Sequence, residues 1–101
     1  MPEQPSASEL ADRVLAHPSV VRLHGGAFGE ITSLFPGDRV VGVRWPDDET
    51  VEIGVVLRLD QPVRTTVAEL RDSLSEQLVG AIRVDVQVSD VETAEDSPES
   101  A

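Results

Sequence analysis

The stretch from Thr50 to Val91 changes hydrophobic period twice. Apolar residues recur at every second position, then at helical spacing, then again at every second position: Val51, Ile53, Val55, Leu57 and Leu59; Val67, Leu70, Leu74 and Leu78; Ile82, Val84, Val86 and Val88. A period of two is typical of a strand with one buried face, and a period near 3.6 is typical of an amphipathic helix. The pattern therefore predicts a strand, helix, strand unit in a compact α+β domain.

Two helices are expected, each with its own end signals. The long one should begin near Thr66, because Thr66 and Glu69 have the spacing of a capping box, and should stop at Gly80. A shorter helix should begin at Ser8, which can cap it, and should end before Pro18.

Strands are expected on both sides of the long helix. An extended segment at 20–23 precedes strands at 30–35, 40–45 and 51–59, and the Pro-Gly-Asp turn at 36–38 separates the first two of these three. Three consecutive strands form an antiparallel meander, to which the strand after the long helix is added. We therefore predict a two-layer α+β sandwich, in which a small mixed β-sheet carries two helices on one face.

The register between the strands at 40–45 and 51–59 follows from parity. If Val43 faces Ile53, the apolar residues of both strands share the buried face. The same register then makes three pairs on the opposite face: Arg44 with Glu52, Gly42 with Gly54, and Val40 with Val56. The opposite charges of the first pair support the register independently, because the hydrophobic pattern did not use them.

That opposite face carries two facing glycines flanked by valines, which predicts a shallow apolar area where another backbone could approach. We predict that a partner contacts this face through five residues: Val40, Gly42, Gly54, Val56 and Arg58. A local adjustment of strand twist, or a bulge, is the alternative explanation for the two glycines.

Length and polarity indicate one domain. The chain has 101 residues, which suffices for a single small core. Residues 1–7 and 91–101 are polar segments that cannot offset their ordering entropy by burial, so both are expected to be disordered. The single domain should span 8–90, with an acidic tail after it.

Charge and composition narrow the classes of function. The chain has 19 acidic residues, 8 basic residues that are all arginine, and a net charge of −11, which opposes binding to nucleic acid or to an anionic bilayer. Because cysteine is absent, disulfides, thiolate catalysis and cysteine-based zinc sites are excluded. Neither a membrane-spanning apolar run nor a leader pattern is found, so a cytosolic protein is expected.

One glycine-rich loop is a candidate ligand site, formed by His24, Gly25, Gly26 and Gly29. The last two glycines have the spacing of the loop by which KH domains clamp a nucleic-acid backbone, but the two residues between them are not basic. The loop also lacks the Gly-Lys-Ser/Thr ending of a phosphate-binding P-loop. The structural interpretation is a flexible turn in which Phe28 plugs the core.

Other candidate chemistry is sparse. His17 and His24 are too few for a metal cluster, and the adjacent acids at 47–49 lack the spaced ligands of a calcium loop. No Gly-x-Ser-x-Gly motif is present for triad hydrolysis. We therefore expect no catalytic residues, no metal, no cofactor and no small-molecule substrate.

Taken in order, the segments at 11–15, 19–26, 39–43, 51–80 and 82–88, the last of the type Val-x-Val-x-Val, resemble the alkaline shock protein family of bacterial envelope stress response proteins. The likeness is to the small form found in high-GC actinobacteria. The resemblance implies a non-enzymatic cytosolic protein, and some members are associated with the membrane through a separate anchor protein. It supplies no catalytic residues.

Two functions are therefore weighed. The first is an interaction module of an envelope or alkaline stress response, acting through self-association or docking of a protein partner. The alternative is a small-molecule or nucleic-acid binding module that uses the loop at 24–29.

Overall fold

The computed structural model describes residues 4–93, which contain two helices and six strands. In chain order the elements are α1 (Ala7–Leu15), β1 (Val20–Leu23), β2 (Thr32–Phe35), β3 (Asp38–Val41), β4 (Val43–Asp47), β5 (Thr50–Arg58), α2 (Val63–Gln77) and β6 (Arg83–Glu92). The predicted α+β class is confirmed. Within this part of the chain, no helix has both the length and the apolar character needed to cross a membrane.

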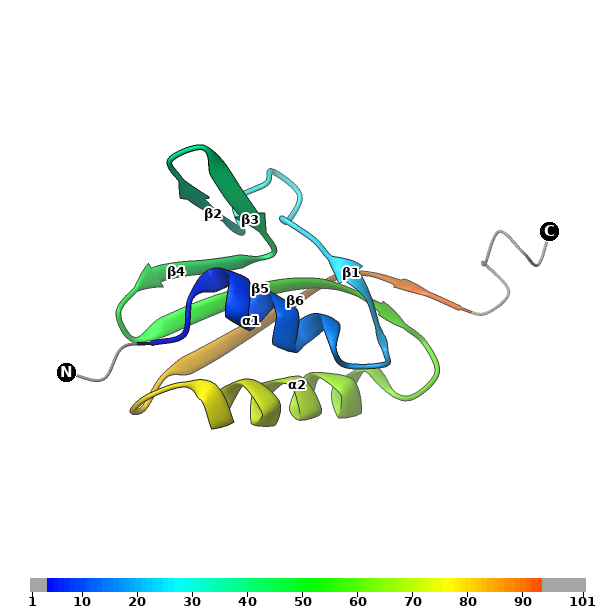
Figure 1. Cartoon of the computed structure of the whole chain (residues 1–101). Helices are drawn as coiled ribbons and strands as arrows, with labels where there is room; N and C mark the ends of the chain where they lie inside the picture. The colour runs from blue at the N-terminus through cyan, green and yellow to red at the C-terminus, as the bar shows by residue number, and fades with distance from the viewer. Residues whose placement is uncertain (1–3, 94–101) are drawn as a thin grey trace.

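The sheet is built around β5. On one edge of β5, β4 pairs antiparallel with its first half and β1 pairs antiparallel with its second half, whereas β6 runs parallel along the whole of the other edge. Both helices lie in front of the sheet in Figure 1, with α2 below α1. The predicted mixed sheet with two helices on one face is confirmed.

One core joins the helices to the sheet. Its buried members come from α1, β1, β4, β5, α2 and β6: Ala7, Leu10, Ala11, Val14, Val20, Val43, Val51, Ile53, Val55, Leu57, Leu70, Leu74 and Val84. The positions of β5 and α2 in this set are those that the two hydrophobic periods assign to the buried face. The predicted strand, helix, strand unit corresponds to β5, α2 and β6.

Both helices begin earlier than predicted. The cap of α1 is Ser6, whose hydroxyl accepts from the Glu9 N–H while the Glu9 carboxylate accepts from the Ser6 N–H. The first residue of α2 is Val63, directly after Pro62. Thr66 cannot cap this helix, because it is buried inside the second turn and its hydroxyl accepts from Gln61.

The predicted register is confirmed where β4 pairs with β5. Val43 lies opposite Ile53, and Arg44 lies opposite Glu52 with 3.4 Å between the guanidinium nitrogen and the carboxylate oxygen.

The expected pairing of Val40 with Val56 is wrong. Val40 instead pairs with Ser33, and Val56 pairs with Arg22 of β1. The strand predicted at 40–45 is interrupted at Gly42, whose φ of 93° lies in the left-handed region that favours glycine. The predicted meander is therefore divided between two sheets.

Before Gly42, β2 and β3 form a separate two-stranded sheet. This hairpin projects away from the body of the molecule in Figure 1. The hydroxyl of Ser33 donates to the Val43 carbonyl at 2.6 Å and fixes the base of the hairpin to β4.

The domain extends beyond the expected limits of 8 and 90. The Gln4 side chain donates to the Val79 carbonyl at 2.6 Å and accepts from the Val79 N–H at 2.8 Å, so the N-terminal segment is fastened to the end of α2. At the other end, β6 continues to Glu92, whose carbonyl accepts from Leu59. The disorder expected at 1–3 and 94–101 lies outside the described residues.

Candidate functional site

The predicted contact face of β5 is covered. Gly42 and Gly54 are buried, Val56 is 0% exposed, and the half-buried Val40 packs against the core. Arg58 is exposed, and its guanidinium donates to the Pro18 carbonyl at 2.8 Å. The expectation that this face is open to a partner is therefore wrong at every position except Arg58.

The chain itself covers the two glycines. A Cβ on Gly54 would overlap the His24 carbonyl oxygen and would lie 3.2 Å from a methyl carbon of Ile31, a residue that is 2% exposed. The backbones are linked in series: His24 donates to Gly54 at 2.8 Å, Gly54 to Gly42 at 2.9 Å, and Gly42 to Ile31 at 2.7 Å. Another backbone does approach the glycines, as predicted, but it belongs to the segment that follows β1.

The glycine-rich loop is already filled by a carboxylate. The N–H of Phe28 donates to Glu30 at 2.9 Å, and a Cβ on Gly26 would lie 2.7 Å from the same carboxylate. The Gly26 N–H donates to the His24 ring at 2.9 Å, and the Gly29 N–H donates to the Gly26 carbonyl at 3.2 Å. An incoming phosphate would meet a negative charge and occupied donors, so this geometry opposes the nucleic-acid interpretation of the loop.

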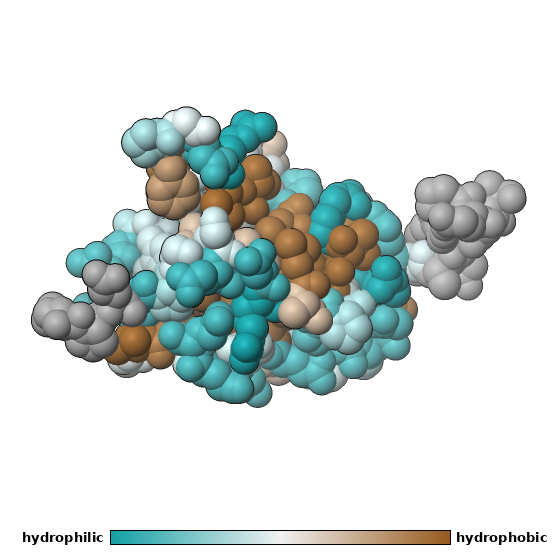
Figure 2. All heavy atoms as spheres, in the orientation of Figure 1, coloured by the Kyte–Doolittle hydropathy of each residue, from teal (hydrophilic) through white to brown (hydrophobic). Residues whose placement is uncertain are grey.

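Exposed apolar side chains gather on the hairpin and on the loop beside it. We call Phe28, Leu34, Phe35 and Val41 the hairpin surface. Phe28 is 94% exposed and Leu34 is 79% exposed, and the other two are partly exposed. Figure 2 shows hydrophobic atoms at the base of the hairpin and over neighbouring β1, whereas α1 and α2 are mostly hydrophilic in this view. The prediction that Phe28 plugs the core is wrong.

The sequence contained a signal for this surface, namely two large apolar residues directly before a turn. Leu34 and Phe35 immediately precede the turn at Pro36-Gly37-Asp38. Because a hairpin turn lies at a free end of its strands, large apolar residues beside it are far from the core unless something covers them. The prediction placed both in a strand of a single meander, but the left-handed turn at Gly42 separates the β2–β3 hairpin from the main sheet.

An open hollow of about 490 Å³ lies beside the hairpin surface. It is lined by Pro5, Ser6 and Ala7 at the start of α1, by Thr32, Ser33, Leu34 and Phe35 of β2, and by Arg44 and Trp45 of β4. None of the predicted partner or loop residues lines it. Its lining joins apolar side chains to one guanidinium, so it extends the hairpin surface toward the main sheet.

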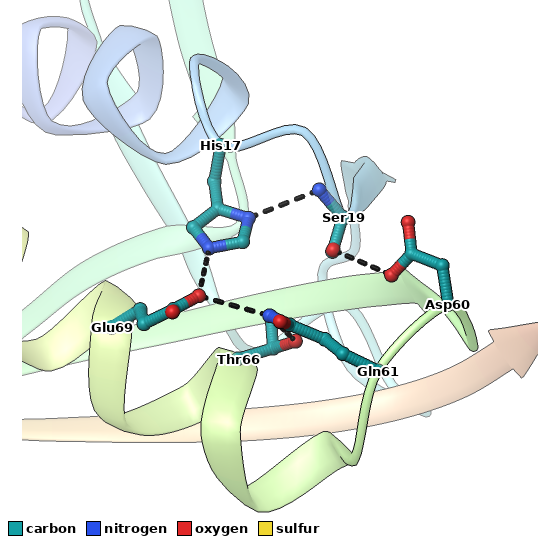
Figure 3. Close-up of polar contacts among 6 residues, drawn as sticks. All are labelled: His17, Ser19, Asp60, Gln61, Thr66 and Glu69. Atoms are coloured by element: carbon teal, nitrogen blue, oxygen red, sulfur yellow. Dashed lines mark hydrogen bonds and ion pairs between the residues drawn. The ribbon is translucent and has the colours of Figure 1, made fainter.

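A polar cluster joins the turn after α1 to the start of α2 (Figure 3). The carboxylate of Glu69 accepts from His17 Nε2 at 2.8 Å and from the Gln61 amide at 2.9 Å. These two hydrogen bonds, first that from Gln61 and then that from His17, hold the pKa of the Glu69 carboxyl below its usual value.

This cluster contains a serine, a histidine and acids, but its hydrogen bonds do not form a catalytic triad. The Ser19 hydroxyl donates to Asp60 at 2.7 Å, and His17 Nδ1 accepts the backbone N–H of Ser19 at 3.0 Å. His17 therefore carries its proton on Nε2, and its Nδ1 is already occupied by the Ser19 N–H. Neither ring nitrogen can accept the proton of the Ser19 hydroxyl. Because Ser19 is also 3% exposed, the cluster fastens the two connections rather than presenting a nucleophile.

Within residues 4–93, no group of three or more His, Cys, Asp or Glu side chains is placed to hold a metal ion. The two histidines lie in different settings, since His17 contacts α2 and His24 contacts the glycine loop. In the acidic turn, the Asp47 carboxylate accepts from the Glu49 N–H at 2.8 Å, as in an ordinary polar turn.

No family model, curated protein or solved structure matches this chain. The resemblance to the alkaline shock proteins therefore stays a prediction from the sequence.

Proposed function

We propose that this chain is a non-enzymatic, cytosolic interaction module that docks a protein partner through the hairpin surface. The observation that carries the proposal is the exposure of four apolar side chains, three on the projecting hairpin and one on the loop before it, in a strongly acidic molecule. Exposed apolar clusters of this kind mark interaction sites, because leaving them in water is unfavourable.

The hairpin is suited to such contacts because it stands clear of the sheet. Leu34 pairs with Arg39, and Phe35 pairs with Asp38, so the two exposed apolar residues of β2 each have a charged neighbour across the hairpin. A partner that covers the apolar residues would also meet one charge of each sign. This arrangement favours a protein surface over a lipid or nucleic-acid surface, whose phosphates the net charge of −11 repels.

The resemblance to alkaline shock proteins supports a place in an envelope stress response. Membrane association would then come through the docked partner, as in the family members with a separate anchor protein. No small-molecule substrate, cofactor or nucleic acid forms part of this proposal. The alternative ligand module is less favoured, because the loop on which it depends encloses Glu30.

Capture from a lysate of the native host, combined with crosslinking from position 34, tests the proposal. Leu34→Asp should abolish recovery of the partner, because it places a charge on the hairpin surface at a side chain that is 79% exposed. Leu15→Asp is the matched control, since Leu15 is 48% exposed but lies at the end of α1. A partner that binds wild type and both variants equally, or that crosslinks only from α1, would contradict the proposal.

A further inference from the structure

Among residues 4–93, no strand pairs with the outer edge of β6 in the main sheet. β6 is ten residues long and, within the part of the chain that the structure describes, pairs with β5 alone. An edge strand presents unpaired N–H and C=O groups that serve as a template for another strand. This edge lies on the opposite side of β5 from β4 and β1, and the hairpin joins the sheet through β4.

The backbone groups that face outward can be assigned. The Arg83 N–H donates to the Glu49 carbonyl next to β5, so the backbone of Arg83 faces inward. The Val84 carbonyl accepts from the Arg71 side chain at 3.2 Å, so the backbone of Val84 faces outward. Because direction alternates along a strand, the N–H and C=O of Val86 and Val88 face outward as well.

Residues 83–88 lack the sequence features that usually protect an edge strand. Residues 83–88 contain no proline, glycine or lysine, and the irregularity in the pairing with β5 comes only after Val88. The two charges in the segment, Arg83 and Asp85, bond each other at 2.8 Å. They lie on the face of the sheet away from the helices and so do not cover the outward backbone groups, of which the Val84 carbonyl already accepts from Arg71.

We propose that β6 pairs antiparallel with β6 of a second copy of this chain, around a two-fold axis at Val86. In this register Val86 lies opposite Val86 of the second copy, and Val84 lies opposite Val88. All three outward-facing residues then fall in hydrogen-bonded pairs, each of which exchanges two bonds. The Val88 N–H of the second copy takes the place of Arg71 at the Val84 carbonyl.

The side chains favour the same register. On the helix face, valine meets valine and extends the apolar core across the interface. On the other face, Asp85 meets Gln87 of the second copy, whose amide can donate to the carboxylate. A register centred on Val88 would instead place Val86 opposite Asp90 and cross the strand irregularity. A register centred on Val84 would leave Val88 opposite Gly80, outside the strand.

Analytical ultracentrifugation of the full chain tests the register through one exposed residue. Gln87→Glu places like charges opposite each other at two symmetric positions and should raise the dimer dissociation constant about fivefold, whereas Gln87→Arg should lower it about fivefold. Ser8→Glu and Ser8→Arg, on exposed α1, are matched controls for the change in net charge. Added salt should tighten the dimer, since it screens the repulsion between two copies that carry −11 each.

Val86→Pro gives a second test. Proline removes an N–H that faces away from β5, so the ladder to β5 is retained while the central pair of the dimer is lost. This variant should stay folded by circular dichroism and sediment as a monomer. A wild-type chain that is monomeric at every concentration would overturn the proposal. So would a dimer that responds to Leu34→Asp and not to Gln87 substitution, which would assign self-association to the hairpin surface.

Discussion

At Gly54 the missing side chain allows the segment that follows β1 to lie directly against β5. Gly54→Ala should destabilise the protein by about 3 kcal/mol, the upper part of the range for overpacking, because the new Cβ overlaps the His24 carbonyl oxygen and backbone must move. Urea unfolding measures this. Gly37→Ala is the control: its φ is 76° but nothing lies within 4 Å, so only the backbone cost of about 1 kcal/mol applies. Equal losses in both variants would show that crowding at Gly54 is absent.

The hydrogen bonds to Glu69 should make the protein less stable as the pH falls. Its pKa is lowered in the folded state, so its contribution is present above the unfolded value of about 4.3 and is lost as pH falls through the folded value. The melting temperature of wild type should therefore exceed that of Glu69→Gln at pH 6, and the difference should shrink below about pH 4. A difference that grows on acidification would contradict the assigned hydrogen bonds.

At the scale of elements, α2 is held to the sheet by its buried stripe. Leu74 is fully buried in the core between this helix and β5, so Leu74→Ala should cost about 2 to 5 kcal/mol, much of the stability of a domain of this size. Its exposed neighbour gives the control: Ser75→Ala should change stability by less than about 0.5 kcal/mol. Chemical unfolding measures the loss of stability in each variant and so checks which face of α2 is buried. Similar losses in both would mean that Leu74 does not lie on the buried face.

For the whole molecule, the ends of the domain contribute to its stability. If the ends were disordered, as the sequence predicts, a chain of residues 8–91 would unfold like the parent. That truncation instead removes the Ser6 cap, the Gln4 bonds to Val79 and the Glu92 carboxylate that pairs with Arg22 at 2.9 Å. Loss of the cap alone costs about 1 kcal/mol, which lowers the melting temperature by about 4 to 8 °C.

The chain of residues 4–93 keeps all of these contacts and should melt within a degree or so of the parent. Differential scanning calorimetry of the two truncated chains and the parent separates the contributions. If 8–91 melts with the parent, the contacts at the two ends add nothing to stability.

The pattern of the sequence determined the fold class, the β5, α2 and β6 unit, and the register at Val43 and Arg44. These features depend on the local period of apolar residues and on a charge pair between neighbouring strands, and both are readable along the chain. The helix starts were displaced by two or three residues because capping depends on which hydroxyl is free to accept: Ser6 is, and Thr66 is not.

Only the tertiary structure decided which face of β5 is covered and where apolar side chains remain exposed. Val56 has the alternation of an outward-facing residue, and its burial depends on the segment at 24–31 returning over Gly54, a contact between positions far apart in the chain. Phe28 and Leu34 are both large apolar residues of the kind found in cores, yet both are exposed. Phe28 lies on the loop after β1, and Leu34 lies on the hairpin that the left-handed turn at Gly42 separates from the main sheet. Periodicity reports how a strand divides into two faces, whereas the packing of distant segments determines which face meets water.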